Sequence, residues 1–187
     1  MRLSLRTVLI ALVALVAIGS AFSALSGVSP TASATPSASP SASVSNEILS
    51  DTQCTKDTPG VSLVIEFSGG AQDLQFCQQG FTEDGWQLLA NVAEVGGTEQ
   101  YQTGFVCRIN GWPAPADQDC IDTPKYSEGS WAYFLSNSKN KWSYSGIGAK
   151  FHKPACGSAE AWLWVPSAKS PTQALPTIAP KTFKCAT

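Results

Sequence analysis

The chain has 187 residues, among them 12 Lys or Arg, 14 Asp or Glu, one His and six Cys. Arg2 and Arg6 belong to a segment that is interpreted below as a leader, and without them ten basic residues face fourteen acidic ones. A net charge of −4 with no basic stripe argues against nucleic acid and anionic lipid as partners.

The first 24 residues predict a secretory signal peptide. Two arginines precede an apolar run from Val8 to Ile18, and small residues follow, which is the order of an export signal. We expect cleavage after Ala21, with a site near Ala34 as the alternative. An uncleaved membrane anchor is a second alternative, because residues 8–25 approach the length that crosses a bilayer.

Residues 25–52 predict a disordered linker. Ser, Ala, Pro and Thr dominate this segment, which therefore cannot bury enough apolar surface to fold. We interpret it as a tether between the cell surface and a domain, with an O-glycosylated stalk as the alternative. The domain is expected over residues 53–165, a length that holds one hydrophobic core. A proline-rich tail over residues 166–187 should be tied back to it by a disulfide.

Two strands, over residues 61–67 and 74–77, should open the domain. A helix is predicted next, with Thr82 as its N-cap and apolar side chains recurring at helical spacing from Trp86 onwards. Gly96 should end this helix. Because nothing else is available to cover its apolar stripe, the helix must lie on a sheet.

Residues 104–110 predict the next strand, which should end at the tight turn Asn110-Gly111 before a long loop. The tryptophan-rich segment that follows predicts three more strands, over residues 131–136, 142–144 and 160–165. This order predicts an α+β domain in which one helix packs on a mostly antiparallel or mixed sheet.

Six cysteines behind an export signal predict three disulfides. None of the six lies in a C-x-x-C pair and the chain has one histidine, so no metal site is expected. Fifteen pairings are open, and spacing alone does not choose among them. We favour three pairings. The first would link the segment before the first strand to the second strand, the second would close the loop after Asn110-Gly111, and the third would hold the tail on the domain. These are Cys54–Cys77, Cys107–Cys120 and Cys156–Cys185.

Four tryptophans, Trp131, Trp142, Trp162 and Trp164, are the candidate ligand-binding residues. Trp162 and Trp164 alternate along one strand and therefore share a face, and Trp131 is a candidate neighbour. If exposed, they would form a stacking platform for a flat ligand or a sugar. The alternative, favoured for any single tryptophan in so small a domain, is burial under the helix.

No catalytic constellation is recognised in the sequence, so we do not expect an enzyme. His152, the single histidine, is interpreted as a surface loop residue, since neither a G-x-S-x-G motif nor a free thiol accompanies it. Glu128 and Glu160 would suit a glycosidase acid and base, but surface positions are the preferred interpretation. Arg108 should hold a carboxylate inside the fold or, alternatively, reach an anionic ligand.

Several segments, in this order along the chain, resemble the transcobalamin-like C-terminal domain family (DUF4430), above all its secreted actinobacterial members. The segments are Gly85-Trp-Gln-Leu-Leu89, the FVCRING block over residues 105–111, Trp131-Ala-Tyr-Phe134 and Gly148 through Trp162. The resemblance covers about residues 54–165, and the FVCRING block is its most specific part. It implies a β-grasp-like fold with one helix on a small mixed sheet.

The resemblance also supports two of the three disulfides. Cys54, Cys77, Cys107 and Cys120 match cysteine positions of the family, whereas Cys156 and Cys185 lie outside its pattern and pair only as the remainder. In cobalamin carriers a domain of this kind forms one wall of the corrinoid site, and a helical domain that has no counterpart in this sequence forms the other.

Two functions from different classes follow as hypotheses. The first is a secreted, non-catalytic binding module without a cofactor, tethered at the cell surface, that captures a corrinoid or another small nutrient. The second is a protein-interaction or structural module of the cell envelope that has no small ligand.

Overall fold

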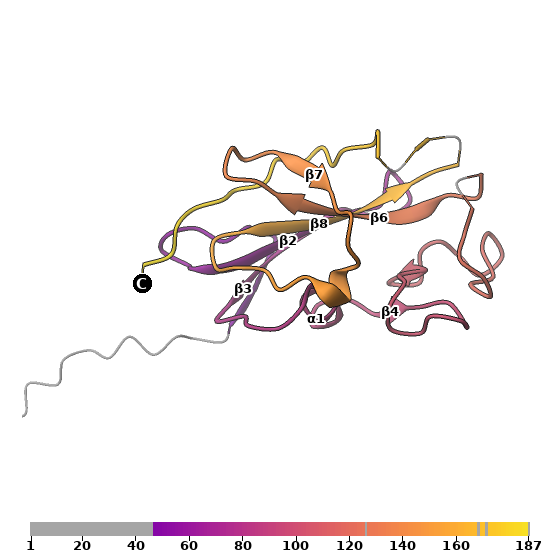
Figure 1. Cartoon of the computed structure of the whole chain (residues 1–187), viewed down its shortest axis with the longest axis horizontal. Coiled ribbons are helices and arrows are strands. Elements are labelled where there is room, and N and C mark those ends of the chain that lie inside the picture. Colours follow the sequence, from indigo (N-terminus) through magenta and orange to yellow (C-terminus); the bar gives the residue numbers. More distant parts are fainter. Residues whose placement is uncertain (1–46, 126, 168, 171, 187) are drawn as a thin grey trace, which may run out of the picture. The chain divides into compact units, whose positions relative to one another are not determined.

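The computed structural model describes residues 47–125, 127–167, 169–170 and 172–186, so the predicted signal peptide and most of the linker lie outside it. The described chain folds around a six-stranded mixed sheet (Figure 1). Its strands, in the spatial order β1-β3-β2-β8-β6-β7, are β1 (Ile48–Ser50), β3 (Leu74–Gln79), β2 (Gly60–Glu66), β8 (Ala159–Val165), β6 (Ser130–Ser136) and β7 (Trp142–Tyr144). Only β2 and β8 run parallel; the other neighbours are antiparallel.

One face of the sheet carries the first hydrophobic core. The helix α1 (Gly85–Ala90) packs on this face with Trp86, Leu88 and Leu89. Side chains from alternate positions of β2, β6 and β8 meet it there, because successive residues of a strand point to opposite faces. The α+β class, with one small helix on a mixed sheet, is therefore confirmed.

The opposite face carries a second core, which the C-terminal tail covers. Phe134 of β6 and Leu163 of β8 belong to this core, and Ala174 and Ile178 of the tail pack against it. All seven residues of β2 and all seven of β8 are consequently buried. The segment that the sequence presents as a tail is thus a layer of the fold.

The strands of the main sheet lie close to their predicted positions, with one addition. β1 pairs with β3 and lies inside the stretch predicted as linker, so the sheet begins before the boundary expected at residue 53. The three disulfides Cys54–Cys77, Cys107–Cys120 and Cys156–Cys185 are all present, which confirms the favoured pairings.

The predicted helix is wrong at both ends. Its N-cap is Asp84, whose carboxylate accepts a hydrogen bond from the Gln87 backbone N–H (2.9 Å), and not Thr82. It ends at Ala90, and the residues expected to prolong it include the strand β4 (Val95–Gly96). A backbone that hydrogen-bonds to a neighbouring strand cannot also continue a helix.

The strand predicted over residues 104–110 is reduced to β5 (Arg108–Ile109), which pairs with β4 in a separate two-stranded sheet. The chain turns back at once, because Ile109 and Trp112 exchange backbone hydrogen bonds across the tight turn (both 3.0 Å). Asn110 and Gly111 both have positive φ angles there, as this turn type requires.

Candidate functional site

The four candidate tryptophans are buried, with exposed fractions of 5–9%. Trp131, Trp162 and Trp164 lie together in the first core, and the Trp131 and Trp164 rings meet edge to face at 5.7 Å. Trp142 lies in the second core, on the other face of the sheet, where its indole N–H donates to the Ile178 carbonyl of the tail (2.7 Å). The four tryptophans therefore do not form one exposed stacking platform. The alternative interpretation, burial in the core, is confirmed.

Two cavities still touch candidate tryptophans. Trp131 and Trp162 line a cavity of about 210 Å³ beneath the loop between β7 and the short 3-10 helix η1 (Ala149–Phe151). That volume is below the usual range of about 300–1,000 Å³ for small-molecule sites. Trp164 lines a second cavity, of about 530 Å³, between the sheet and the tail.

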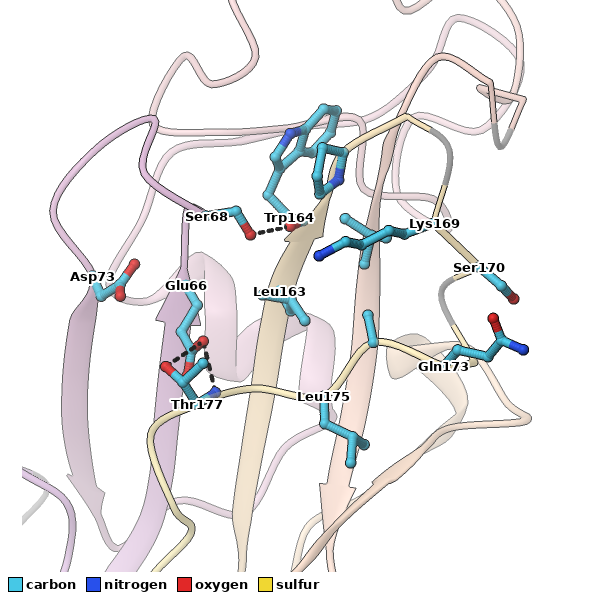
Figure 2. Close-up of a pocket in the computed structure, with 13 residues that line it drawn as sticks. Glu66, Ser68, Asp73, Leu163, Trp164, Lys169, Ser170, Gln173, Leu175 and Thr177 are labelled. Atoms are coloured by element: carbon cyan, nitrogen blue, oxygen red, sulfur yellow. Dashed lines mark hydrogen bonds between the residues drawn. The ribbon is translucent and has the colours of Figure 1, made fainter.

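Figure 2 shows this second cavity and the buried carboxylate at its edge. Glu66, on β2, is 3% exposed and accepts three hydrogen bonds from the tail. Thr177 donates its backbone N–H (2.9 Å) and hydroxyl (3.1 Å), and Ile178 donates its backbone N–H (2.7 Å). Both carboxylate oxygens are therefore engaged in holding the tail, and we assign Glu66 a structural role.

Further anchors hold the tail as far as its end. Gln53, itself 2% exposed, donates to the Ala179 carbonyl (3.0 Å) and accepts from the Lys181 N–H (2.8 Å). Asn140 then accepts from the Thr182 N–H (2.8 Å), and the disulfide to Cys156 follows at Cys185. The path of the tail is fixed at several points across the sheet.

A larger cavity, of about 660 Å³, lies where the tail ends, and we call it the tail-end cavity. The segment before β2, the turn after β3, the loop before β8 and the end of the tail form its walls; in Figure 1 the yellow tail ends beside the indigo segment that precedes β2. Its lining residues are Lys56, Pro59, Gly60, Gly80, Phe81, Thr82, Cys156, Lys184, Cys185 and Ala186. A proline, a phenylalanine and a disulfide give it apolar walls, with two lysines as its charged groups.

A buried polar cluster lies at the start of α1, away from these lysines. Glu160 of β8 is 1% exposed, and neither of its carboxylate oxygens has a hydrogen bond of standard geometry. The His152 Nε2 atom lies 3.4 Å from Glu160 Oε1. A Cβ atom on Gly85 would collide with the Tyr133 hydroxyl and would lie 2.6 Å from Glu160 Oε2, so these two oxygens face the same glycine.

This environment favours the neutral forms of Glu160, His152 and Tyr133. Burial, with a further contribution from the negative charge of Asp84, raises the pKa of Glu160 to about 8, although the nearby Tyr133 hydroxyl opposes the shift. Burial lowers the pKa of His152, and burial together with the Glu160 charge raises that of Tyr133. The prediction that Glu160 is a surface residue is wrong, and His152 is partly buried instead of solvated.

The structure does not assemble the glycosidase pair considered from the sequence. Glu128 precedes β6 and accepts a hydrogen bond from the Lys125 N–H (3.1 Å) in its own turn. Glu160 lies across from Leu135, towards the other end of β6. Glu128 thus lies just before the start of β6, whereas Glu160, on the neighbouring strand β8, lies beside the far end of β6.

Arg108 binds backbone oxygens, and the prediction that it holds a carboxylate is wrong. Its Nε–H donates to the Pro113 carbonyl (2.9 Å), and its Nη2 donates to the Gln118 carbonyl. The guanidinium therefore fixes the loop that the Cys107–Cys120 disulfide closes.

Sequence reasoning missed the tail-end cavity. Its lining comes from four segments that are remote in the chain, and the signals for their meeting were the expected disulfides Cys54–Cys77 and Cys156–Cys185. Among the described residues, no helix is both long and apolar enough to span a bilayer, and no cluster of metal-ligating side chains is found.

Comparison of the chain with protein-family models, curated proteins and solved structures found no match. The resemblance to the transcobalamin-like family stays a prediction.

Proposed function

We propose that this protein is a secreted, non-catalytic binding module that captures a small molecule in the tail-end cavity. The observation that carries the proposal is a cavity of about 660 Å³ with apolar walls, within the size range of small-molecule sites. Three disulfides fit a protein of an extracellular, oxidising environment.

The construction of the wall supports this proposal. The tail is held by Glu66, Gln53 and Asn140 before it reaches the cavity, and the Cys156–Cys185 disulfide fixes its last turn. A wall that is held in place before the ligand arrives loses little conformational entropy on binding, so more of the contact energy is retained as affinity.

The resemblance to the transcobalamin-like family makes a corrinoid one candidate ligand. The tail-end cavity would hold an edge or a side chain of so large a molecule instead of enclosing it. A smaller nutrient would fill the same space.

The test is native mass spectrometry of the protein recovered from a culture supernatant, compared with a Thr82→Trp variant that places an indole at the cavity. Thr82 is exposed, so the variant should fold; Thr103→Trp, at another exposed threonine, is the matched control. A small molecule that copurifies with the wild type and the control but not with Thr82→Trp supports the proposal. A corrinoid would also be identified by its visible absorption spectrum. A protein that binds nothing, or retains its ligand in Thr82→Trp, contradicts it.

A second candidate function is an envelope protein-interaction module, and one surface favours it. Tyr144, Ile147 and Phe151, from β7 to η1, are 43%, 50% and 83% exposed. Exposed apolar side chains concentrated in so short a segment are typical of protein-binding surfaces. A photo-crosslinking amino acid at Phe151 should then capture a specific envelope protein in intact cells, whereas the same probe at Tyr101, which is 50% exposed, should not.

A further inference from the structure

We propose that the ligand of the tail-end cavity is an amphiphile with an apolar hydrocarbon chain and an anionic head group, in the simplest case a fatty-acid carboxylate. This inference rests on the proposed function, because it names the ligand class of the same site. Its starting point is the contrast between apolar walls and two positive charges in one cavity.

The apolar part of the cavity suits a hydrocarbon chain. Pro59, Phe81, Ala186 and the Cys156–Cys185 disulfide offer surfaces without hydrogen-bonding side-chain groups. Thr82 carries the one uncharged polar side chain of the lining. A sugar or a nucleoside would bring many hydroxyl and amide groups that these walls cannot satisfy, and unsatisfied polar groups lower affinity. A hydrocarbon chain meets no such cost.

The charged part of the cavity suits an anion. Lys56 reaches it from the segment before β2, and Lys184 from the tail, so two independent segments supply ammonium groups to one site. None of the ten lining residues is acidic, although the chain as a whole carries more carboxylates than ammonium groups. Among the described residues, no carboxylate lies within 4.0 Å of either ammonium.

The nearest acidic neighbours in sequence do not change this balance. Asp57 and Glu83 follow Lys56 and Thr82 in the chain, but both are exposed and neither lines the cavity. Within the described part of the chain the two lysines therefore have no carboxylate partner and can meet an anionic head group, while their methylene stems extend the apolar wall. A carboxylate on an apolar chain satisfies both halves of the site at once.

The experiment compares two probes with unbranched chains of nearly equal length and opposite head groups, dodecanoate and dodecyltrimethylammonium, by isothermal titration calorimetry below their micelle concentrations. We expect dodecanoate to bind the full secreted protein one to one, and the cationic probe to bind at least about tenfold more weakly. Lys56→Glu/Lys184→Glu should reverse this order. Lys139→Glu/Lys141→Glu, in the exposed turn between β6 and β7, should leave it unchanged.

A third variant, Cys156→Ser/Cys185→Ser, removes the disulfide wall. The hydrogen bonds from Glu66, Gln53 and Asn140 still hold the rest of the tail, so the domain should stay folded while binding of both probes weakens. Near-ultraviolet circular dichroism of the buried tryptophans checks the fold.

The outcomes separate the two proposals. If both probes bind equally and both are lost in Cys156→Ser/Cys185→Ser, the cavity is a binding site but the anionic ligand class is wrong. If neither probe binds, or if binding is unchanged in Cys156→Ser/Cys185→Ser, the proposed ligand class is wrong. The copurification test then shows independently whether the tail-end cavity is a binding site. Lysine-dependent binding to phosphatidylglycerol vesicles without affinity for monomeric dodecanoate would also overturn the assignment. The lysines would then bind anionic head groups at a membrane surface, and no single amphiphile would occupy the cavity.

Discussion

Replacing Glu160 by Gln should remove a pH dependence of stability that the wild type shows above pH 6.5. Glu160 is 1% exposed, and burial raises its pKa from 4.5 to about 8. The folded state therefore holds a proton that the unfolded state releases between these two pH values. Stability must fall as the pH rises through this window, by about 1.4 kcal/mol per pH unit.

His152 opposes this effect on the acidic side. Burial lowers its pKa below 6.5, so just below that pH the unfolded state binds the extra proton and stability rises with pH. His152 therefore offsets the slope due to Glu160 there, and as the unfolded-state imidazole loses its proton above pH 6.5 the slope becomes that of Glu160. From pH 6.5 to 8 the wild type should thus lose about 2 kcal/mol of unfolding free energy.

The assay is urea unfolding of the disulfide-intact protein at pH 6, 7, 8 and 9, followed by tryptophan fluorescence. Gln is close to the shape of a protonated Glu and does not ionise, so Glu160→Gln should be flat above pH 6.5 and about 2 kcal/mol more stable than the wild type at pH 9. Glu99→Gln, at an exposed carboxylate, should keep the wild-type slope. A flat wild type, or a Glu160→Gln variant with the wild-type slope, would refute the reasoning.

Three further substitutions test the packing. Glu66→Ala should cost about 2 kcal/mol and expose the tail amides to hydrogen exchange, because two partly buried N–H groups lose their acceptor; unchanged protection would contradict this role. Gly85→Ala should lower the free energy of unfolding, measured with denaturant, by about 2 kcal/mol, because the new methyl group meets the Tyr133 hydroxyl even though alanine has the better helix propensity. Gly146→Ala, where the space around the new methyl group is open, should be nearly neutral. Trp162→Ala should cost about 3–5 kcal/mol; a stable variant that merely lost ligand binding would restore the platform hypothesis.

The main sheet could be predicted because side chains alternate between the two faces of each strand and apolar residues occur on both faces. In β8, alternation placed Trp162 and Trp164 on one face, and they share the first core. The same alternation places Glu160 on that face as well, yet a single carboxylate is far more often exposed than buried, so its burial was not predicted. What decides it is the contact with Gly85 of α1, which no local pattern encodes.

The helix and the strand after it were overestimated for a related reason. Helical spacing continues past Ala90, but the backbone at Val95 and Gly96 pairs with β5 instead. Propensity and periodicity describe what a segment can form alone, and here a tertiary hydrogen-bond partner outweighs them.

The tail is the part of the candidate site that composition most misrepresents. Its prolines and small residues predict a segment without a core of its own, and it has none, because it packs on the core of the sheet through Ala174 and Ile178. Its fixed path depends on Glu66, more than a hundred residues earlier. Since those contacts end at the Cys156–Cys185 disulfide, the layer that completes the second core also builds the tail-end cavity. A ligand in that cavity would touch the tail and the segment before β2 together, and by binding the folded state alone it would stabilise the tail against release.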